Sequence, residues 1–467
     1  MNKLQLLNKC KELGISKYSS KNKPQLIELI NLQYYNNIKE PVIILPVIEE
    51  PVIILPVIKE PVIILPVIEE PTTINISQNQ QLTYIDLFCG IGGFHQALNK
   101  IGAKCLLACD IDKDCRMVYK DNYGIDPVSN IKEIDETTLP DFDILCGGFP
   151  CQAFSNGGKK KCFEDNRGLL FDEIIRISKV KKPKFMFLEN VKHILKVSNG
   201  TVINYIKEQI ANIGYHLQLF QISPHNFGIP QQRERVYFVC VRNDIYNGRQ
   251  IVLPNYTGSI TFENYLDKLD DIAEKYFIKG DTLQVLEAWD KMIHKFNVGE
   301  RISPTILIND AFKIYSQTEF DGFPDWRQDY ITKNKRIIEK YNSEFKEWYN
   351  EYSEIMQKRE IYGKLEWQTG LIKENDSIFN HFIQIRQSGI RVKKAHYFPT
   401  LVAISQIPIY GKEKRYITPR ECARLQSFPE SFKLSKDDKK SYKQLGNSVN
   451  VDNVYTVIQS TLTGYNM

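Results

Sequence analysis

Cys151 is the cysteine whose surroundings favour nucleophilic chemistry. It follows Pro150 in the segment GGFPCQAFS (147–155), directly after the apolar run DILC at 143–146. Proline fixes the backbone there and projects the thiol from the end of a predicted strand. Three other cysteines lie inside apolar runs that predict strands: Cys105, Cys109 and Cys240. The sequence therefore predicts Cys151 as a nucleophile and those three as core residues.

An acid and two arginines accompany two other predicted strands. Glu189 directly follows the mostly apolar run KFMFL at 184–188. Because burying an unpaired carboxylate costs free energy, we expect the pKa of Glu189 to be raised. A raised pKa is what a proton donor requires. In QQRERVYFV (231–239), Arg233 and Arg235 are two residues apart and are predicted to share one face of a strand. Two arginines heading an apolar strand favour a role in a site.

A glycine-rich turn follows the first predicted strand of this region. The segment YIDLFCGIGGF (84–94) predicts a strand, a turn and a helix that begins near Gly93. His95 occupies the third glycine position of the dinucleotide pattern, which disfavours a pyrophosphate cradle. Asp110 ends the next predicted strand, where an acid suits a ribose hydroxyl pair. The turn and the acid together fit an adenosine cofactor without phosphates, such as S-adenosyl-L-methionine.

The elements that must position these residues predict an α/β fold. From residue 83 to about 245, apolar strands alternate with helices, which is typical of a parallel sheet. Residues 246–390 are aromatic-rich and charged, lack that alternation and predict long helices such as Ile337–Ile355. Strands and a capped helix return from Tyr397. The helix begins with the capping box TPRE at 418–421, which has proline at its first position.

Composition excludes several classes of protein. The chain has 467 residues, 42% of them hydrophobic and 25% charged, with 61 Lys+Arg against 56 Asp+Glu and a net charge of +5. This excludes a disordered chain, a disulfide miniprotein and a collagen-like fibre. Because the sequence has no run of 18 apolar residues and no signal-peptide core, we expect no membrane association and a cytoplasmic protein. The cysteine spacing predicts free thiols and no metal site.

The first part of the chain differs from the rest. Residues 1–36 predict two short helices and resemble the SAP-type helix–extended–helix module, which binds DNA in its family; an ordinary helical hairpin is the alternative. Residues 41–70 repeat PVIILPVIEE almost unchanged, with proline every five residues from Pro41 to Pro71. Proline excludes a continuous helix or a central strand, so residues 37–78 predict an extended linker.

Six ordered blocks together carry a family resemblance. They are FxGxGG, GFPCQ, ENV, QxRxR, TPRECARLQ (418–426) and QLGNSV (444–449). Over residues 82–245 and 395–462 the chain resembles the DNA cytosine-C5 methyltransferases of bacterial restriction–modification systems. The resemblance implies a Rossmann-like, S-adenosylmethionine-dependent fold: a mixed sheet with helices on both faces and an inserted target-recognition domain.

The resemblance also implies roles for individual residues. Cys151 would add to C6 of a flipped-out cytosine, Glu189 would protonate N3, Arg235 would bind O2, and Arg233 would order the pocket or contact phosphate. The implied cofactor residues are Phe88, Gly90, Ile91, Gly93, Asp110, Ile111, Asn130, Ile131, Asn447 and Ser448. The implied substrate-binding residues are Phe149, Pro150, Gln152, Ser155, Asn190 and Thr400. Phe149 would offer its carbonyl to the cytosine amine.

Two positions depart from the family pattern. Asp110 replaces the more usual Glu, and Asn130 stands where Asp commonly accepts from the adenine amine; the amide carbonyl still accepts, so cofactor affinity should weaken without being lost. Ile111 would supply an apolar face for adenine.

The expected domains are 1–36 (SAP-like), 37–78 (linker), 79–245 (catalytic), 246–410 (target recognition) and 411–467 (C-terminal segment returning to the catalytic domain). Further predicted DNA contacts, with a solvated basic face as the alternative, are Arg386, Gln387, Arg391, Lys393, Lys394 and Tyr397.

Three alternatives stay open. The same architecture serves RNA cytosine methyltransferases, and an inactive DNA-binding homologue could keep the fold. A nicotinamide oxidoreductase is disfavoured by His95. As partners we expect double-stranded DNA and a cognate restriction endonuclease, and we expect a monomer.

Overall fold

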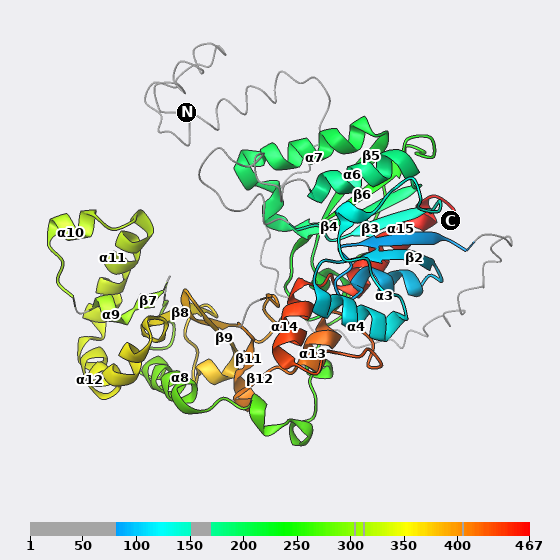
Figure 1. The fold of residues 1–467 in the computed structure, drawn as a ribbon. Coiled ribbons are helices and arrows are strands. Elements are labelled where there is room, and N and C mark those ends of the chain that lie inside the picture. Colours follow the sequence, from blue (N-terminus) through cyan, green and yellow to red (C-terminus); the bar gives the residue numbers. More distant parts are fainter. Residues whose placement is uncertain (1–80, 151–169, 303–304, 312, 404–405) are drawn as a thin grey trace, which may run out of the picture. The chain divides into compact units, whose positions relative to one another are not determined.

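The structure is a computed structural model that describes residues 81–150, 170–302, 305–311, 313–403 and 406–467 (Figure 1). Two groups of predictions lie outside the described residues: the helical module and linker at 1–78, and the segment 151–169 that holds Cys151, Gln152 and Ser155.

A six-stranded sheet forms the first part of the described chain, with strand order β2-β1-β3-β4-β6-β5. Its strands are β1 (Thr83–Leu87), β2 (Lys104–Cys109), β3 (Ile144–Gly147), β4 (Phe185–Val191), β5 (Tyr215–Ile222) and β6 (Arg235–Arg242). Neighbours pair in parallel except at β6, which is antiparallel to both β4 and β5. The expected mixed α/β sheet is therefore confirmed.

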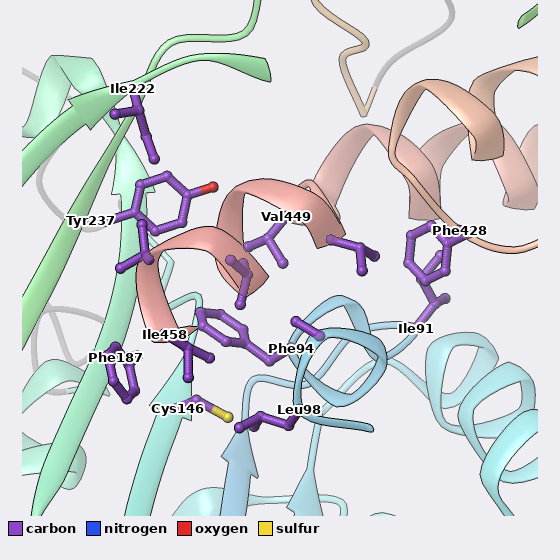
Figure 2. Packing of buried hydrophobic residues seen from close by; sticks show 14 of the residues in the cluster. Ile91, Phe94, Leu98, Cys146, Phe187, Ile222, Tyr237, Phe428, Val449 and Ile458 are labelled. Atoms are coloured by element: carbon purple, nitrogen blue, oxygen red, sulfur yellow. The ribbon is translucent and has the colours of Figure 1, made fainter. Parts of the chain in front are cut away.

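Helices cover both faces of this sheet. They are α3 (Gly93–Asn99), α4 (Lys113–Tyr123), α6 (Leu170–Lys181), α7 (Thr201–Asn212), α13 (Pro419–Leu425), α14 (Asp438–Asn447) and α15 (Val451–Gly464). Successive strand residues point to opposite faces: Phe187 packs with α3 and α15, whereas Met186 and Leu188 pack with α6 and α7. Figure 2 shows the first of these two cores, in which Phe94 and Leu98 of α3 lie beside Ile458 of α15.

The C-terminal segment returns to the first strand, as predicted. A Cβ on Gly93 would lie 2.6 Å from Val449 Cγ2, so only glycine permits this close approach of α3 to the segment before α15. The predicted capping box is confirmed: Thr418 accepts from the Glu421 N–H, and the Glu421 carboxylate accepts from the Thr418 N–H. Glu421 also makes a buried bidentate ion pair with Arg415.

A second six-stranded sheet, ordered β12-β11-β9-β10-β8-β7, lies in the chain between the strands of the first sheet and the helices α13 to α15 that pack on it. Its strands are β7 (Ile306–Leu307), β8 (Lys364–Gln368), β9 (Phe382–Arg386), β10 (Gly389–Lys393), β11 (Ile409–Tyr410) and β12 (Arg415–Tyr416). Its helices are α8 (Gly280–Ile293), α9 (Ile308–Ala311), α10 (Gln317–Asp321), α11 (Asp325–Lys340) and α12 (Asn342–Lys358). One face of this sheet is apolar and packs with α8 and α12.

Two expectations for this region were wrong. The helix predicted over Ile337–Ile355 is two helices, α11 and α12, because the backbone leaves the helical conformation at Tyr341 (φ −119°, ψ 41°). The tyrosine is buried and its hydroxyl donates to Glu300, so a tertiary contact overrides helical periodicity there. Strands also return before Tyr397, at β8 to β10. The sequence did not predict them because they are short and their alternation is brief.

Candidate active site

Three loops meet at the carboxyl edge of the first sheet. Leu87 of β1, Gly147 of β3 and Leu188 of β4 lie side by side in register, so the loops that follow these parallel strands leave from one edge. Antiparallel β6 begins at the same edge, with Arg235 opposite Val191. Topology alone therefore brings the glycine turn, the GGFP loop, Glu189 and Arg235 together.

Glu189 is a buried acid at this edge. Glu189 is 8% exposed. A Cβ placed on Gly148 would lie 3.7 Å from Oε2 of Glu189. Arg235 Nε lies 3.0 Å from Glu189 Oε1, an ion pair in which Oε1 receives no well-aligned hydrogen bond from the described residues. Burial raises the pKa of Glu189, opposed by Arg235 and Arg233, which confirms the expected direction.

Arg233 differs from its expected place. It precedes β6, so it does not share a strand face with Arg235, and it is 2% exposed. Its guanidinium donates to three main-chain carbonyls, those of Leu401 (2.6 Å), Gly446 (2.9 Å) and Ser448 (2.8 Å). A buried guanidinium with these partners orders the segments around the site, and the alternative of a phosphate contact does not fit its burial.

Asn190, which was expected to bind substrate, uses its side chain within the protein. Its amide Nδ2 donates to the Phe149 carbonyl at 3.0 Å, and its Oδ1 accepts from the Val191 N–H. Both polar ends thus serve the protein, and Asn190 fixes the loop that leads through Pro150 to residue 151. The Phe149 carbonyl keeps its second lone pair for another donor.

The glycine turn after β1 adopts left-handed backbone conformations. Phe88 (φ 55°), Gly90 (φ 53°) and Gly92 (φ 88°) all have positive φ. A Cβ on Gly90 would meet no described atom within 4 Å, so the turn faces open space there. The Ile91 side chain is only 1% exposed and belongs to the core, so its main chain is the part available to a ligand.

Asp110 lies across from this turn. Its Oδ2 accepts from the Gly90 N–H and its Oδ1 from the Asp112 N–H, both at 2.8 Å. Burial raises its pKa, and these two hydrogen bonds oppose the rise. Ile111 next to it is 83% exposed. An acid fixed against a glycine turn beside an exposed apolar side chain fits the ribose and adenine of the expected cofactor.

The remaining expected cofactor residues are Asn130 and Ile131, which lie together in one short turn, and Asn447 and Ser448, which lie together at the end of α14. Asn130 caps a short 3-10 turn, Ile131–Glu133, by accepting from the Lys132 N–H, while the Ile131 side chain is buried in the core. Asn447 is exposed, whereas Ser448 is buried and its hydroxyl donates to the Val449 carbonyl. The side chains of Ile131 and Ser448 are therefore used within the protein, and we infer that Ser448 supports the site through its main chain.

A buried network behind the glycine turn was missing from the sequence predictions. Tyr123 Oη lies within hydrogen-bond distance of the Ile91 (3.1 Å) and Gly92 (3.0 Å) carbonyls, and its ring stacks on His95. His95 Nδ1 contacts the Tyr119 hydroxyl at 2.7 Å, and Tyr119 donates to Asp86. Burial raises the pKa of Asp86 to about 8 and lowers that of His95 to about 4. Spacing alone gave no signal for these long-range contacts.

Strand β10 and the segment after it contribute residues at one end of the site. Thr400 Oγ1 donates to the Gln232 carbonyl, and Lys393 Nζ donates to Gln232 Oε1, both at 2.6 Å. Arg386 and Arg391 both form ion pairs with the same carboxylate, that of Glu366.

Within the described ranges, no group of three or more His, Cys, Asp or Glu side chains could hold a metal ion. In the same part of the chain, none of the helices is both long enough and apolar enough to cross a membrane.

Comparisons with known proteins agree on one family. The model of the family "C-5 cytosine-specific DNA methylase" matches residues 82–463. Type II methyltransferase M.HhaI of Haemophilus parahaemolyticus is 31% identical over 375 residues, 80% of this chain and 92% of that protein. Type II methyltransferase M1.ScrFI of Lactococcus lactis subsp. cremoris is 32% identical over 81% of this chain and 77% of its own length. The solved structure of the Entamoeba histolytica methyltransferase EhMeth shares the fold, with a TM-score of 0.50, 19% identity, and coverage of 83% of this chain and 99% of that one.

Proposed function

This chain belongs to the C-5 cytosine-specific DNA methylase family, and from that premise we propose which of its residues carry the reaction. The enzyme transfers a methyl group from S-adenosyl-L-methionine to carbon 5 of cytosine in DNA. The chemistry fixes what the site must supply, because carbon 5 is a weak nucleophile and C6 is hidden in the base stack. The base must therefore leave the helix and be activated covalently.

Cys151 is the proposed nucleophile. Its thiolate adds to C6, and the electron pair moves through the ring so that carbon 5 attacks the methyl group. Solvent water then takes the C5 proton, the C5–C6 double bond re-forms as the S–C6 bond breaks, and N3 returns its proton to Glu189, which restores both the thiolate and the acid. S-adenosyl-L-methionine, when bound, would supply the electrophilic methyl group and would be converted to S-adenosylhomocysteine. The GGFP loop that leads to Cys151 is held by the Asn190–Phe149 hydrogen bond.

Glu189 is the proposed acid, and its position is the observation that carries the proposal. The carboxyl is buried, has a raised pKa and faces Gly148, the start of the loop that leads to Cys151. A protonated carboxyl donates to N3 as negative charge develops on the ring, and its other oxygen accepts from the exocyclic amine. Arg235, which lies 3.0 Å from Glu189, binds O2 and holds the acid in place.

The proposed cofactor site lies on the other side of the GGFP loop. Asp110 binds the ribose hydroxyls, Ile111 packs on adenine, and the main chain of Phe88–Gly93 surrounds the methionine part. Asn130 keeps one lone pair for the adenine amine. The hydrogen bond from Gly90 to Asp110 and the open space above Gly90 support this placement.

The proposed partners follow from the relatives. Two of them carry the name "Type II methyltransferase", so we place the protein in a restriction–modification system with a cognate endonuclease. We propose that it acts on duplex DNA in the cytoplasm of a bacterial host and that it is a monomer. Residues 246–410 are the proposed target-recognition domain, with Thr400 contacting DNA.

Glu189→Gln tests the role of the acid. The amide cannot give a proton to N3, so we expect DNA binding to persist while methyl transfer slows by about 10²-fold or more. In the wild type, the rate should fall as pH rises through the raised pKa of Glu189, because the protonated form is the active one. The variant should lose that alkaline limb. Tritiated methyl transfer to duplex DNA across pH measures both effects.

Glu234→Gln is the matched control. Glu234 is exposed, pairs with Lys192 and lies next to Arg235, so the same chemical change there should leave rate and pH profile unchanged. Near-normal turnover of Glu189→Gln contradicts the assignment. Competition between duplex DNA and transfer RNA in the same assay separates DNA from RNA methylation.

A further inference from the structure

The second sheet has a polar face opposite its apolar core. Strand register places Arg391 of β10 between Glu366 of β8 and Gln384 of β9. Ile390 and Val392 alternate with Arg391 and are fully buried on the other side. We call the polar surface the arginine face, and its residues are Glu366, Gln384, Arg386, Arg391 and Lys393.

Glu366 holds Arg391 in a fixed orientation. Arg391 Nε donates to Glu366 Oε2 at 2.8 Å and Nη2 donates to Oε1 at 3.0 Å, a bidentate pair. These bonds use one edge of the planar guanidinium. The end formed by Nη1 and the second hydrogen of Nη2 has no hydrogen-bond partner in the described part of the chain. Two parallel N–H donors are therefore presented outward from a rigid support.

The arginine face borders a cavity of about 1080 Å³. Its lining includes Glu366, Arg386 and Arg391 from the sheet, and Trp326 and Tyr330 from α11. Arg386 approaches Glu366 as well, at 3.4 Å, so this single carboxylate faces two guanidinium groups and the local charge is positive. The cavity is thus open to a polar, electron-rich group that accepts two hydrogen bonds.

The arginine face continues to the active site. Lys393 is two residues after Arg391 in β10, so it lies on the same side of the strand. Its ammonium donates to Gln232 Oε1, and Gln232 belongs to the segment that leads into Arg233 and Arg235. Lys393 therefore connects the arginine face to the segment that leads into the active edge.

We propose that Arg391 is a specificity-determining residue that reads a guanine of the recognition sequence in duplex DNA, and that Glu366 is its positioning residue. Guanine presents two adjacent acceptors, N7 and O6, in the major groove, and they match the two N–H donors of an arginine end. Adenine presents an acceptor beside a donor, and neither pyrimidine presents such a pair. This inference rests on the proposed function, since it assigns one base of the DNA that the enzyme methylates.

The experiment starts from the recognition sequence, obtained by bisulfite sequencing of DNA from cells that express the protein. Each guanine in a duplex of that sequence is then replaced, one at a time, by 7-deazaguanine, which lacks the N7 acceptor. We expect one replacement to lower the wild-type kcat/KM about tenfold or more. The same replacement should not lower the kcat/KM of Arg391→Gln any further. Replacements at other guanines should lower kcat/KM equally in the wild type and in Arg391→Gln.

Two variants separate base reading from folding and charge. Arg391→Lys keeps the charge but not the fork, so it should retain DNA affinity and lose the penalty at that one guanine. Glu366→Gln should reduce the penalty without abolishing methylation, because the arginine loses its rigid support. Arg336→Gln, an exposed arginine on α11, is the control and should behave as the wild type.

Three results are distinguishable from the expected one. An equal 7-deazaguanine penalty in wild type and Arg391→Gln would overturn the proposal. Uniform loss on every duplex with a shallower salt dependence would assign Arg391 to phosphate and would also overturn it. Absence of methylation by the wild type on any duplex would instead contradict the proposed function.

Discussion

Tyr123 lies outside the sequence motifs, yet it supports the glycine turn at Ile91 and Gly92. Its hydroxyl reaches the Ile91 and Gly92 carbonyls, and its ring fills the space that a Cβ on Gly92 would need, with the nearest ring atom 2.3 Å from that position. His95, burying its ring against Tyr123, completes the support. The turn proposed to hold the cofactor is therefore shaped from behind by α4.

Tyr123→Phe should weaken cofactor binding without disturbing DNA binding. The ring still fills its space, but both carbonyls lose their hydroxyl partner, so the turn becomes less ordered. We expect the dissociation constant for S-adenosylhomocysteine, measured by titration calorimetry, to rise several-fold. Tyr246→Phe, whose ring stacks on His216, should leave that constant unchanged. An unchanged constant in Tyr123→Phe would show that the turn needs no such support.

Sequence reasoning succeeded for residues whose role depends on their own strand. Glu189 ends an apolar strand, and its burial and raised pKa follow from that position alone. It gave no signal for contacts with distant partners. The Asn190 side chain holds Phe149, a contact across 41 positions that no local pattern records, and its role in substrate binding stays a prediction.

At the scale of elements, Arg233 joins three chain segments. Its main-chain N–H donates to Ser223 after β5, and its side chain binds the Leu401 carbonyl and the two carbonyls at Gly446 and Ser448 before α15. The charge is costly to bury, and burial lowers its pKa to about 9. The planar guanidinium donates to these carbonyls from two nitrogens, Nη1 and Nη2, and the single nitrogen of a lysine ammonium cannot take both positions.

Arg233→Lys should therefore destabilise the protein despite its unchanged charge. We expect the free energy of unfolding to fall by about 2–4 kcal/mol, because charge-assisted hydrogen bonds to buried carbonyls are lost. Urea unfolding followed by circular dichroism measures this, with the exposed Arg249→Lys as the control. Equal stability of the two variants would mean that Arg233 does not join these segments.

Helices and strands were predictable where the alternation of apolar and polar residues, or a capping motif, lies within the element itself. The strand, turn and helix around residues 83–99 follow from alternation and glycine, and the TPRE box marks the start of α13. The second sheet was missed because β8, β9 and β10 have five residues each and pair across intervening helices and turns. The break at Tyr341 depends on a buried tertiary contact, which periodicity does not contain.

At the scale of the whole molecule, the chain departs from its catalytic sheet and returns to it. The first sheet ends in sequence at Arg242, yet α15 packs against α3 from the far end of the chain. The order of the six motifs predicted this return, because the last block completes a site begun by the first. The proposed mechanism depends on it, since the GGFP loop, Glu189 and Arg235 meet only when the sheet is assembled.

Covalent trapping tests the central claim most directly. Duplex DNA with 5-fluorocytosine at the methylation site blocks loss of the group at C5, so the enzyme–DNA bond that forms first should persist. With S-adenosylmethionine, we predict a denaturation-resistant complex of wild type and DNA whose cross-linked peptide contains Cys151. Cys151→Ser should bind the duplex and give no such complex. A complex that survives in Cys151→Ser, or a cross-link at another residue, would contradict the account.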